Sequence, residues 1–316
     1  QVWTSLGEEE RDQGKPTVLR ACAMTLIVAT DDEDTHTGAV AQTLVELMHV
    51  HPSRAIVLRV VKDEENGLAA RVFAQCWKPF GKAQQICCEQ IEISARPERW
   101  LDVGPAALGI VVPDLPVVVW CRQRQVLVSG EKNVQRAGLE PVLALATKII
   151  IDSSGSDRVA VLNTLREWRR AGRVVADLEW TRLTPWRETI ATVFDDPAIL
   201  SQRHNIHTVE IAYGEAEPST GVLYIAAWLE HGLHVKSSLV RQEDAAEGLQ
   251  RITLQSDTLR IDLSRSNPTC LQLTIGDKDQ RVSLAGSSQY ELMNEELSVL
   301  GPDAAFDAAF NAVGGI

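Results

Sequence analysis

Arginine and tryptophan residues lie close together in this chain, and this combination can bind anions or a partner protein. Arg182 and Arg187 flank Trp186, and Trp180 precedes Arg182 by two positions. Arg54 opens an apolar segment in the first half. A guanidinium group can hold a sugar phosphate through two parallel hydrogen bonds and can stack on an indole ring. Tryptophan and arginine are also enriched at the energetic centres of protein interfaces.

A purely structural role is the third interpretation of these arginines. A buried pair between an arginine and Asp177, Glu179 or Glu188 would hold the start of a helix in place. The sequence therefore leaves three interpretations open for the Arg/Trp residues, which are a structural ion pair, a protein interface and a ligand site.

Six cysteines are scattered through apolar segments: Cys22, Cys76, Cys87, Cys88, Cys121 and Cys270. Cys87 and Cys88 are adjacent on an expected strand, so their side chains point to opposite faces and cannot share a metal ion or form an unstrained vicinal disulfide. We interpret them as two small core residues, with a redox switch as the alternative. This use of cysteine is typical of a reducing compartment.

Motifs for nucleotide binding, nucleophilic catalysis and metal binding are missing or incomplete. There is no G-x-x-x-x-G-K-[ST] loop and no G-x-G-x-x-G after the first strand, which instead ends in DDED. Neither G-x-S-x-G nor H-E-x-x-H occurs. His204/His207 and His231/His234 have H-x-x-H spacing without an obvious third ligand. We therefore expect no catalytic residue, no metal site and no cofactor.

The elements that would position these residues begin with a strand–helix–strand unit. Apolar runs at 23–30 and 55–61 flank a segment, 37–49, with apolar residues at helical spacing, and a right-handed parallel crossover is expected. Further strands are expected at 68–77, 84–93, 115–122 and 147–154, with helical stretches at 97–111, 133–146 and, capped by Ser156, 159–172. This pattern predicts a mostly parallel, helix-covered α/β sheet over residues 1–175.

The pattern changes in residues 176–316, for which we expect a second, α+β domain. A helix is expected over 180–200, with Thr184 as its N-cap and Pro185 at its first position. Four short segments of alternating polarity predict an antiparallel β-meander. The expected elements are a strand at 207–214, a helix at 219–231, the meander strands at 251–256, 259–264, 270–276 and 280–286, and a final helix at 289–312.

Charge is divided unevenly between the two halves. Residues 1–175 hold 21 Lys/Arg against 22 Asp/Glu, whereas residues 176–316 hold 10 against 21. An acidic half disfavours nucleic acid and anionic membranes as partners. It serves either as a solubilising surface or as a docking face for a basic partner. No apolar run reaches the roughly 20 residues of a membrane span, and the start of the chain does not resemble a signal peptide, so a cytoplasmic location is expected.

Six longer segments carry a resemblance to one protein family. In chain order they are HPSRAIVL (51–58), QICCEQIEI (85–93), DLPVVVWC (114–121), KIIIDSS (148–154), DLEWTRLTPWRETIATVFDDP (177–197) and LYIAAWLEHGL (223–233). In order and approximate spacing they resemble the motifs of the OpcA family of glucose-6-phosphate dehydrogenase assembly proteins. The resemblance covers about residues 20–235, and the segment 177–197 is its most specific part.

The resemblance implies a protein that binds glucose-6-phosphate dehydrogenase and promotes its active, oligomeric state in the oxidative pentose phosphate pathway. It implies no catalytic residues and no cofactor. The expected contact surface includes Arg54, Trp180, Arg182, Trp186 and Arg187. The alternative, from a different class, is a sugar-phosphate sensor or enzyme in which Arg54, Arg182 and Arg187 bind the phosphate.

Overall fold

The computed structural model describes residues 19–31, 39–61, 67–78, 85–128, 133–284 and 288–313. The chain forms two compact units. The first consists of Gln1–Asp152, Val159–Val175 and Met293–Gly301, and the second of Ser153–Arg158, Ala176–Leu292 and Pro302–Ile316. Residues Met293–Gly301 thus belong to the first unit although they follow most of the second in sequence. Within the described residues no helix is both long enough and apolar enough to cross a bilayer.

The first unit is built on a mostly parallel sheet. Its strands are β1 (Leu19–Arg20), β2 (Met24–Thr30), β3 (Ser53–Val60), β4 (Leu68–Trp77), β5 (Ile86–Ala95), β6 (Val117–Cys121), β7 (Lys148–Ile151) and β8 (Val175–Asp177). The order is β1-β5-β3-β2-β6-β7-β8, and β4 pairs with β5 in the antiparallel direction. Every residue of β2 and β6 is buried, as expected for central strands covered on both faces. The predicted sheet class is confirmed.

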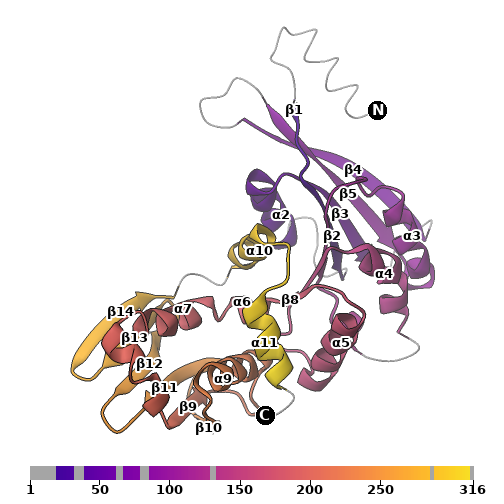
Figure 1. Ribbon diagram of the computed structural model, residues 1–316. Coiled ribbons are helices and arrows are strands. Elements are labelled where there is room, and N and C mark those ends of the chain that lie inside the picture. Colours follow the sequence, from indigo (N-terminus) through magenta and orange to yellow (C-terminus); the bar gives the residue numbers. More distant parts are fainter. Residues whose placement is uncertain are drawn as a thin grey trace. The chain divides into compact units, whose positions relative to one another are not determined.

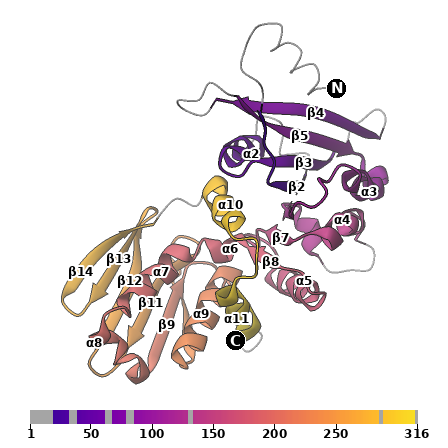
Figure 2. The ribbon, with the colours of Figure 1, turned by 45° about the horizontal axis from the view of Figure 1, so that its top comes forward.

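Helices connect these strands on both sides of the sheet. They are α2 (Ala39–Val50), a 3₁₀ turn (Pro97–Asp102) leading into α3 (Val103–Leu108), a second 3₁₀ turn (Arg124–Leu127), α4 (Val134–Leu145) and α5 (Arg158–Arg170). In Figures 1 and 2, α2 lies on one side of the sheet and α3 and α4 lie on the other. Apart from the two-residue edge strand β1 and the antiparallel β4, the order β5-β3-β2-β6-β7-β8 starts in the middle at β2 and reverses direction once, as in doubly wound dinucleotide-binding folds.

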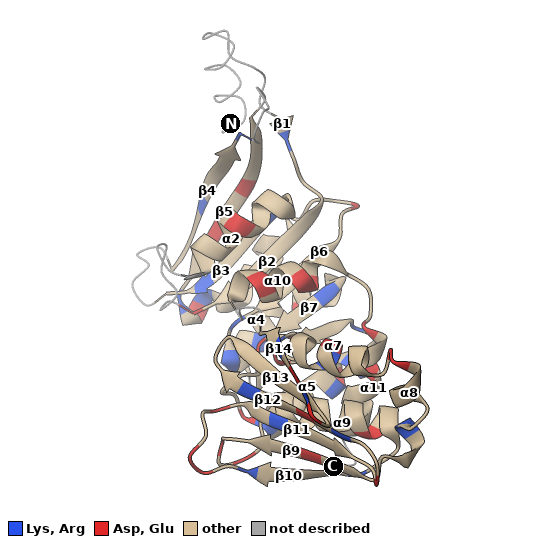
Figure 3. Cartoon of the chain, turned by 90° about the vertical axis from the view of Figure 1, so that its left-hand side faces the viewer, with Lys and Arg blue, Asp and Glu red and all other residues tan. Residues whose placement is uncertain are grey.

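The second unit contains a mixed sheet that is mainly antiparallel (Figure 3). Its strands are β9 (Thr208–Tyr213), β10 (Ser237–Arg241), β11 (Leu249–Gln255), β12 (Arg260–Asn267), β13 (Cys270–Ile275) and β14 (Lys278–Ser283), in the order β10-β9-β11-β12-β13-β14. The meander β11–β14 confirms the alternating pattern of the sequence. The parallel edge strand β10 was not expected, because its segment SSLVR is short and largely exposed.

The helices of the second unit are short except for one. They are α6 (Leu178–Thr181), α7 (Thr184–Val193), α8 (Pro197–Leu200), a 3₁₀ turn (Arg203–Asn205), α9 (Thr220–Leu233) and α11 (Ala304–Ala312), while α10 (Gln289–Ser298) spans the point where the chain returns to the first unit. α9 and α11 pack against each other through Tyr224, Phe306 and Phe310, with ring centroids 5.4–6.4 Å apart.

Three helices expected from the sequence are interrupted, and a proline lies near each interruption. The expected helix 180–200 ends at Val193, and Pro197 starts α8 under the cap of Asp196. The expected helix 289–312 is divided at Pro302, after which Asp303 caps α11. The stretch 97–111 begins as a 3₁₀ turn at Pro97. Because proline lacks the N–H donor, it starts helices more readily than it continues them.

Two expected helix caps lie one or two residues from the observed helix starts. α5 begins at Arg158, so Ser156 lies one residue before the N-cap position. The buried face of this helix includes Val161, whereas Val159, which was expected on that face, is 61% exposed. Thr184 is the first residue of α7, after Leu183, and the Thr184 hydroxyl accepts a hydrogen bond from Arg187. The periodicity therefore identified these helices but not their first residues.

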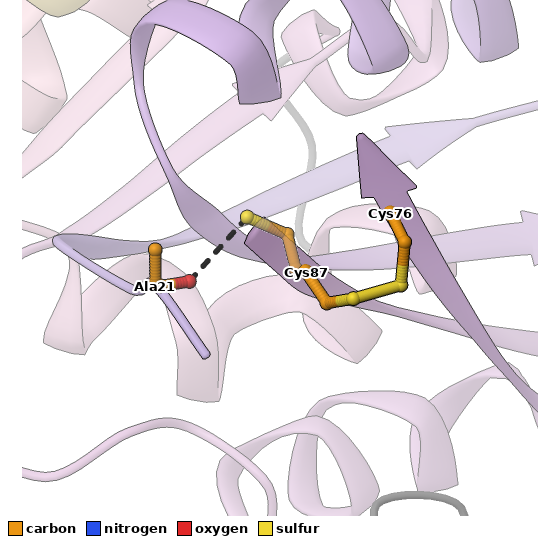
Figure 4. The surroundings of a disulfide bond; sticks show 4 residues. Ala21, Cys76 and Cys87 are labelled. Carbon is orange, nitrogen blue, oxygen red and sulfur yellow. Dashed lines mark hydrogen bonds between the residues drawn. A yellow bond between two sulfur atoms is a disulfide. The ribbon is translucent and has the colours of Figure 1, made fainter. Parts of the chain in front are cut away.

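The interpretation of Cys87 as an unlinked core residue is wrong. A disulfide joins Cys87 to Cys76 across the β4–β5 pair, where the two residues stand directly opposite each other (Figure 4). The adjacency of Cys87 and Cys88 excluded a bond between those two, but the register of the hairpin offered Cys87 another partner. Cys88 points away from the disulfide, is buried, and donates from its thiol to the Ala21 carbonyl at 3.4 Å.

Replacing both Cys76 and Cys87 with serine is expected to lower the free energy of unfolding by about 2–3 kcal/mol. The bond closes a loop between residues 11 apart in sequence, and its loss returns that loop-closure entropy to the unfolded chain. Denaturant titration with and without dithiothreitol is the measurement. Reductant should bring the wild-type protein to the level of the double variant and leave the variant unchanged, with Cys270→Ser as the control. An unchanged wild-type midpoint in reductant would contradict the prediction.

Candidate functional site

A buried carboxylate begins the segment that carries most of the predicted contact residues. Asp177 ends β8 and caps α6, and one of its oxygens accepts the backbone N–H groups of Ser153 and Glu179, both at 3.1 Å. Its other oxygen accepts the Tyr224 hydroxyl at 2.8 Å. The Ser153 hydroxyl lies 2.5 Å from that of Thr220. These bonds join Ser153, α6 and α9 within the second unit.

Burial dominates the electrostatics of Asp177. The residue is fully buried, and loss of solvation raises its pKa to about 6, against the lowering effect of the hydrogen bonds from Ser153, Glu179 and Tyr224. Ionisation of Asp177 therefore costs free energy in the folded protein, because the charged form is poorly solvated there. Its role here is to fix α6, because the Ser153, Glu179 and Tyr224 groups that donate to it all belong to the protein scaffold.

Trp180 lies in the core of the second unit, and its indole ring packs against the guanidinium group of Arg187. Trp180 is 2% exposed, and its indole N–H donates to Asp303 at 2.8 Å. The centre of its ring lies 5.6 Å from that of Phe306. The Arg187 guanidinium lies 3.8 Å from the centre of the indole ring, a cation–π contact. Trp180 therefore cannot itself be the surface anchor of an interface, but it sets the position of a cation.

The other predicted contact residues of this segment divide into buried and accessible ones. Trp186 is 1% exposed and belongs to the core. Arg182 forms an ion pair with Glu179 at 2.7 Å, and both side chains keep partial contact with solvent. The structure thus contains one of the structural pairs considered from the sequence. Arg182 and Arg187 are the predicted contact residues of this segment that reach solvent.

Arg54 belongs to the first unit and is engaged there. It lies on β3, where its guanidinium pairs with Glu89 at 2.5 Å and donates to the Ile110 carbonyl at 2.7 Å. Glu89 also pairs with Arg20 at 2.7 Å. Arg54 therefore lies in a different unit from Arg182 and Arg187.

The structure identifies partners that sequence reasoning did not single out. Ser153, Thr220, Tyr224 and Asp303 complete the surroundings of Asp177 and Trp180. Asp177 itself shows a signal in the sequence, because an aspartate directly before an apolar helical turn is a typical N-cap. The remaining partners are 24 to 123 positions away from their contacts, and no local pattern marks them.

The described residues contain no group of three or more His, Cys, Asp or Glu side chains placed to hold a metal ion.

At the carboxyl ends of β2 and β6, where doubly wound folds bind ligands, Gln123 is fully buried and donates to the Thr30 carbonyl at 3.1 Å. Arg122 also donates to the Thr30 hydroxyl at 3.4 Å. Side chains of the protein occupy part of this region.

The fold and these residues define a doubly wound α/β unit joined to an α+β unit with a buried aspartate and aromatic cluster. Residues 45–167 match the family model described as the glucose-6-phosphate dehydrogenase subunit N-terminal domain, and residues 173–310 match the corresponding C-terminal domain. Together the two matches cover most of the chain. The chain belongs to this family, the OpcA family, as its motifs predicted.

Curated relatives carry the same family name. The OxPP cycle protein OpcA of Nostoc punctiforme is 26% identical over 214 residues, which are 66% of this chain and 44% of the relative. That of Synechocystis sp. is 27% identical over 179 residues, 55% of this chain and 36% of the relative. That of Synechococcus elongatus is 24% identical over 71% of this chain and 48% of the relative. The matches thus span less than half the length of these relatives.

Solved structures show only a distant similarity of fold. Levoglucosan dehydrogenase is similar at a TM-score of 0.47 and 10% identity, over 94% of this chain and 95% of that chain. The 3-ketoreductase KijD10 of Actinomadura kijaniata is similar at 0.44 and 10% identity, over 92% and 96%. At this level of similarity no activity is transferred to the present chain.

Proposed function

We propose that this protein binds glucose-6-phosphate dehydrogenase and, without a catalytic step of its own, favours the active oligomeric state of that enzyme in the oxidative pentose phosphate pathway. The observation that carries the proposal is the match of both family models, which are described as subunit domains of this dehydrogenase. The site geometry supports a binding role, since Asp177 and Trp180 fix the positions of Arg182 and Arg187, which both keep partial contact with solvent.

Activation by binding requires a difference in affinity. A protein that bound the active and inactive states of the dehydrogenase equally well would shift neither population, however tight the complex. To activate the enzyme, this protein must therefore contact a surface that exists, or is correctly arranged, only in the active oligomer of the dehydrogenase. Two accessible arginines held in fixed positions suit such a surface, because little conformational entropy remains to be lost when they bind.

The proposal is tested by titrating this protein into purified cognate dehydrogenase. We expect a lower apparent KM for glucose 6-phosphate and a larger fraction of the higher oligomer by light scattering. No change in activity, substrate affinity and oligomer size would refute the proposal. A parallel thermal-shift measurement with glucose 6-phosphate alone separates the alternative, because a sugar-phosphate sensor would be stabilised by the ligand without the enzyme.

Replacing Arg182 with alanine is expected to weaken binding to the dehydrogenase about tenfold, the loss expected if Arg182 is one of the few interface residues that contribute most of the binding energy. The fold should tolerate the change, because a partly exposed ion pair such as Arg182–Glu179 contributes about 1 kcal/mol or less. The measurement is the dissociation constant by calorimetry, with thermal unfolding as the fold check. Arg241→Ala, at an exposed site on the edge strand β10, is the control. Equal affinities of the two variants would remove Arg182 from the contact surface.

A further inference from the structure

An open groove runs between α7 and the last hairpin of the second unit. It has a volume of about 940 Å³ and is lined by residues of α7, α8, β13 and β14. The register of the hairpin pairs Leu273 with Gln280 and Ile275 with Lys278, which places these side chains on the face of the sheet that looks toward α7. Val282 lies on the same face two residues further along β14. These side chains form the floor of what we call the α7–β14 groove.

The floor of the groove extends to the edge of the sheet. β14 is the last strand in the order β10-β9-β11-β12-β13-β14, and within the described part of the chain no further strand pairs with it. Its first four residues are exposed, and Ile275 and Val282 are only partly covered. An edge strand with apolar neighbours that are half covered is a surface on which another chain segment can pack.

The walls of the groove are acidic. Two carboxylates, Glu188 and Asp196, line it together with one ammonium group, Lys278. Asp196 caps α8. The Asp279 carboxylate lies on the opposite face of the hairpin, where it accepts a hydrogen bond from Thr274 at 2.6 Å. Glu188 is exposed and has no hydrogen-bonding or ionic partner among the described residues. The groove therefore combines an apolar floor with a net negative wall, and at least one of its carboxylates is available for a cation.

We propose that the α7–β14 groove docks a segment of glucose-6-phosphate dehydrogenase in which apolar side chains alternate with lysine or arginine. This inference rests on the function proposed above and identifies the contact. The apolar side chains cover Leu273, Ile275 and Val282, while the basic ones face Glu188 and Asp196. A second copy of the same groove would instead bring like charges together, which disfavours self-association here. An anionic ligand is disfavoured for the same reason.

Charge reversal at Glu188 tests the groove without disturbing the core. Glu188→Lys alters an exposed position of α7, and Glu243→Lys, at an exposed glutamate outside the groove lining, makes the same change in net charge. We expect Glu188→Lys to raise the dissociation constant for the dehydrogenase about tenfold, while the control changes it less than about twofold. Added salt should weaken the wild-type complex more than the Glu188→Lys complex, because a charge contact has already been lost.

Hydrogen exchange and cross-linking locate the occupant. In the complex, β14 and α7 should gain protection, and cross-links to Lys278 should identify a dehydrogenase segment rich in Lys/Arg and apolar residues. If the wild-type protein binds no dehydrogenase, the proposed function fails. If it binds, but Glu188→Lys binds equally well and β14 gains no protection, only the groove inference is overturned. It is likewise overturned if the groove is already protected in the isolated protein, whether by a second copy, shown by light scattering, or by another part of the same chain.

Discussion

Replacing Lys148 with methionine is expected to lower the free energy of unfolding of the first unit by about 3–5 kcal/mol, the usual cost of removing one partner of a buried ion pair. Lys148 opens β7, and its ammonium group lies 2.5 Å from the Glu296 carboxylate. It also donates to the carbonyls of Glu296 and Val299, both at 2.8 Å. The two side chains are 5% and 12% exposed. Methionine keeps the length of the side chain but none of these bonds.

The size of this effect follows from what the change leaves behind. In the variant the Glu296 carboxylate stays largely buried without its main cation, and two carbonyl oxygens at the end of α10 lose a donor. Lys148 also helps to hold residues Met293–Gly301 against a sheet that is far away in sequence, together with the hydrogen bond between His51 and Asn294. The segment should therefore detach more often, and β7 should exchange its backbone protons faster.

Denaturant titration and hydrogen-exchange mass spectrometry of β6 and β7 are the measurements. Lys236→Met is the matched control, because Lys236 also pairs with a glutamate, Glu230 at 2.8 Å, but is 78% exposed. Its loss should cost less than about 1 kcal/mol. The double variant Lys148→Met/Glu296→Gln should recover part of the stability, since no uncompensated charge remains. A Lys148→Met protein that is as stable as the Lys236→Met protein would contradict the role assigned to Lys148.

Local sequence patterns were sufficient for most elements of the fold but not for their long-range partners. The apolar runs that became β2, β3 and β6 and the alternating strands of β11–β14 are visible because burial on both faces or on one face leaves its own periodicity. Strand β8, by contrast, has only three residues, and α6 has only four, too few for a period to appear. Tertiary contacts decide the structure of such short segments.

In the candidate site, too, the sequence identified the segment but not the contacts that its residues make. The segment 177–197 was recognised from its sequence, but Trp180 and Trp186 turned out to be core residues, because an indole ring suits a core as well as an interface. The Cys76–Cys87 disulfide depends on the register of β4 and β5, which no single-strand pattern determines. The α7–β14 groove likewise exists only after the sheet and α7 have packed.

Replacing Asp177 with asparagine is expected to change how stability depends on pH. Burial raises the folded-state pKa of Asp177 to about 6, above the usual value of 3.8 for an exposed aspartate. A raised pKa means that the folded protein holds the proton more tightly than the unfolded chain does. The stability linked to Asp177 is therefore fully present below about pH 4 and is lost as the pH rises through about 6. The free energy of unfolding that depends on this proton is about 3 kcal/mol in total, which corresponds to the rise of the pKa from 3.8 to about 6.

Asparagine removes this dependence because it cannot ionise. Its carbonyl oxygen can still accept the N–H groups of Ser153 and Glu179, and the Tyr224 hydroxyl can rotate to accept from the new amide. Relative to wild type, the variant should therefore gain about 2 kcal/mol or more between pH 4 and pH 7. Comparison of the two proteins at each pH cancels the contributions of all other titrating groups.

Urea titrations of wild type and Asp177→Asn at several pH values between 4 and 7 measure this difference directly. Asp196→Asn is the control, because Asp196 caps α8 as Asp177 caps α6 but is exposed, so its replacement removes a capping carboxylate without changing a buried site. A constant difference between Asp177→Asn and wild type across this range would show that Asp177 is ionised in the fold at no cost. The raised pKa, and the conclusion that this aspartate sacrifices stability at neutral pH to hold α6 in place, would then be wrong.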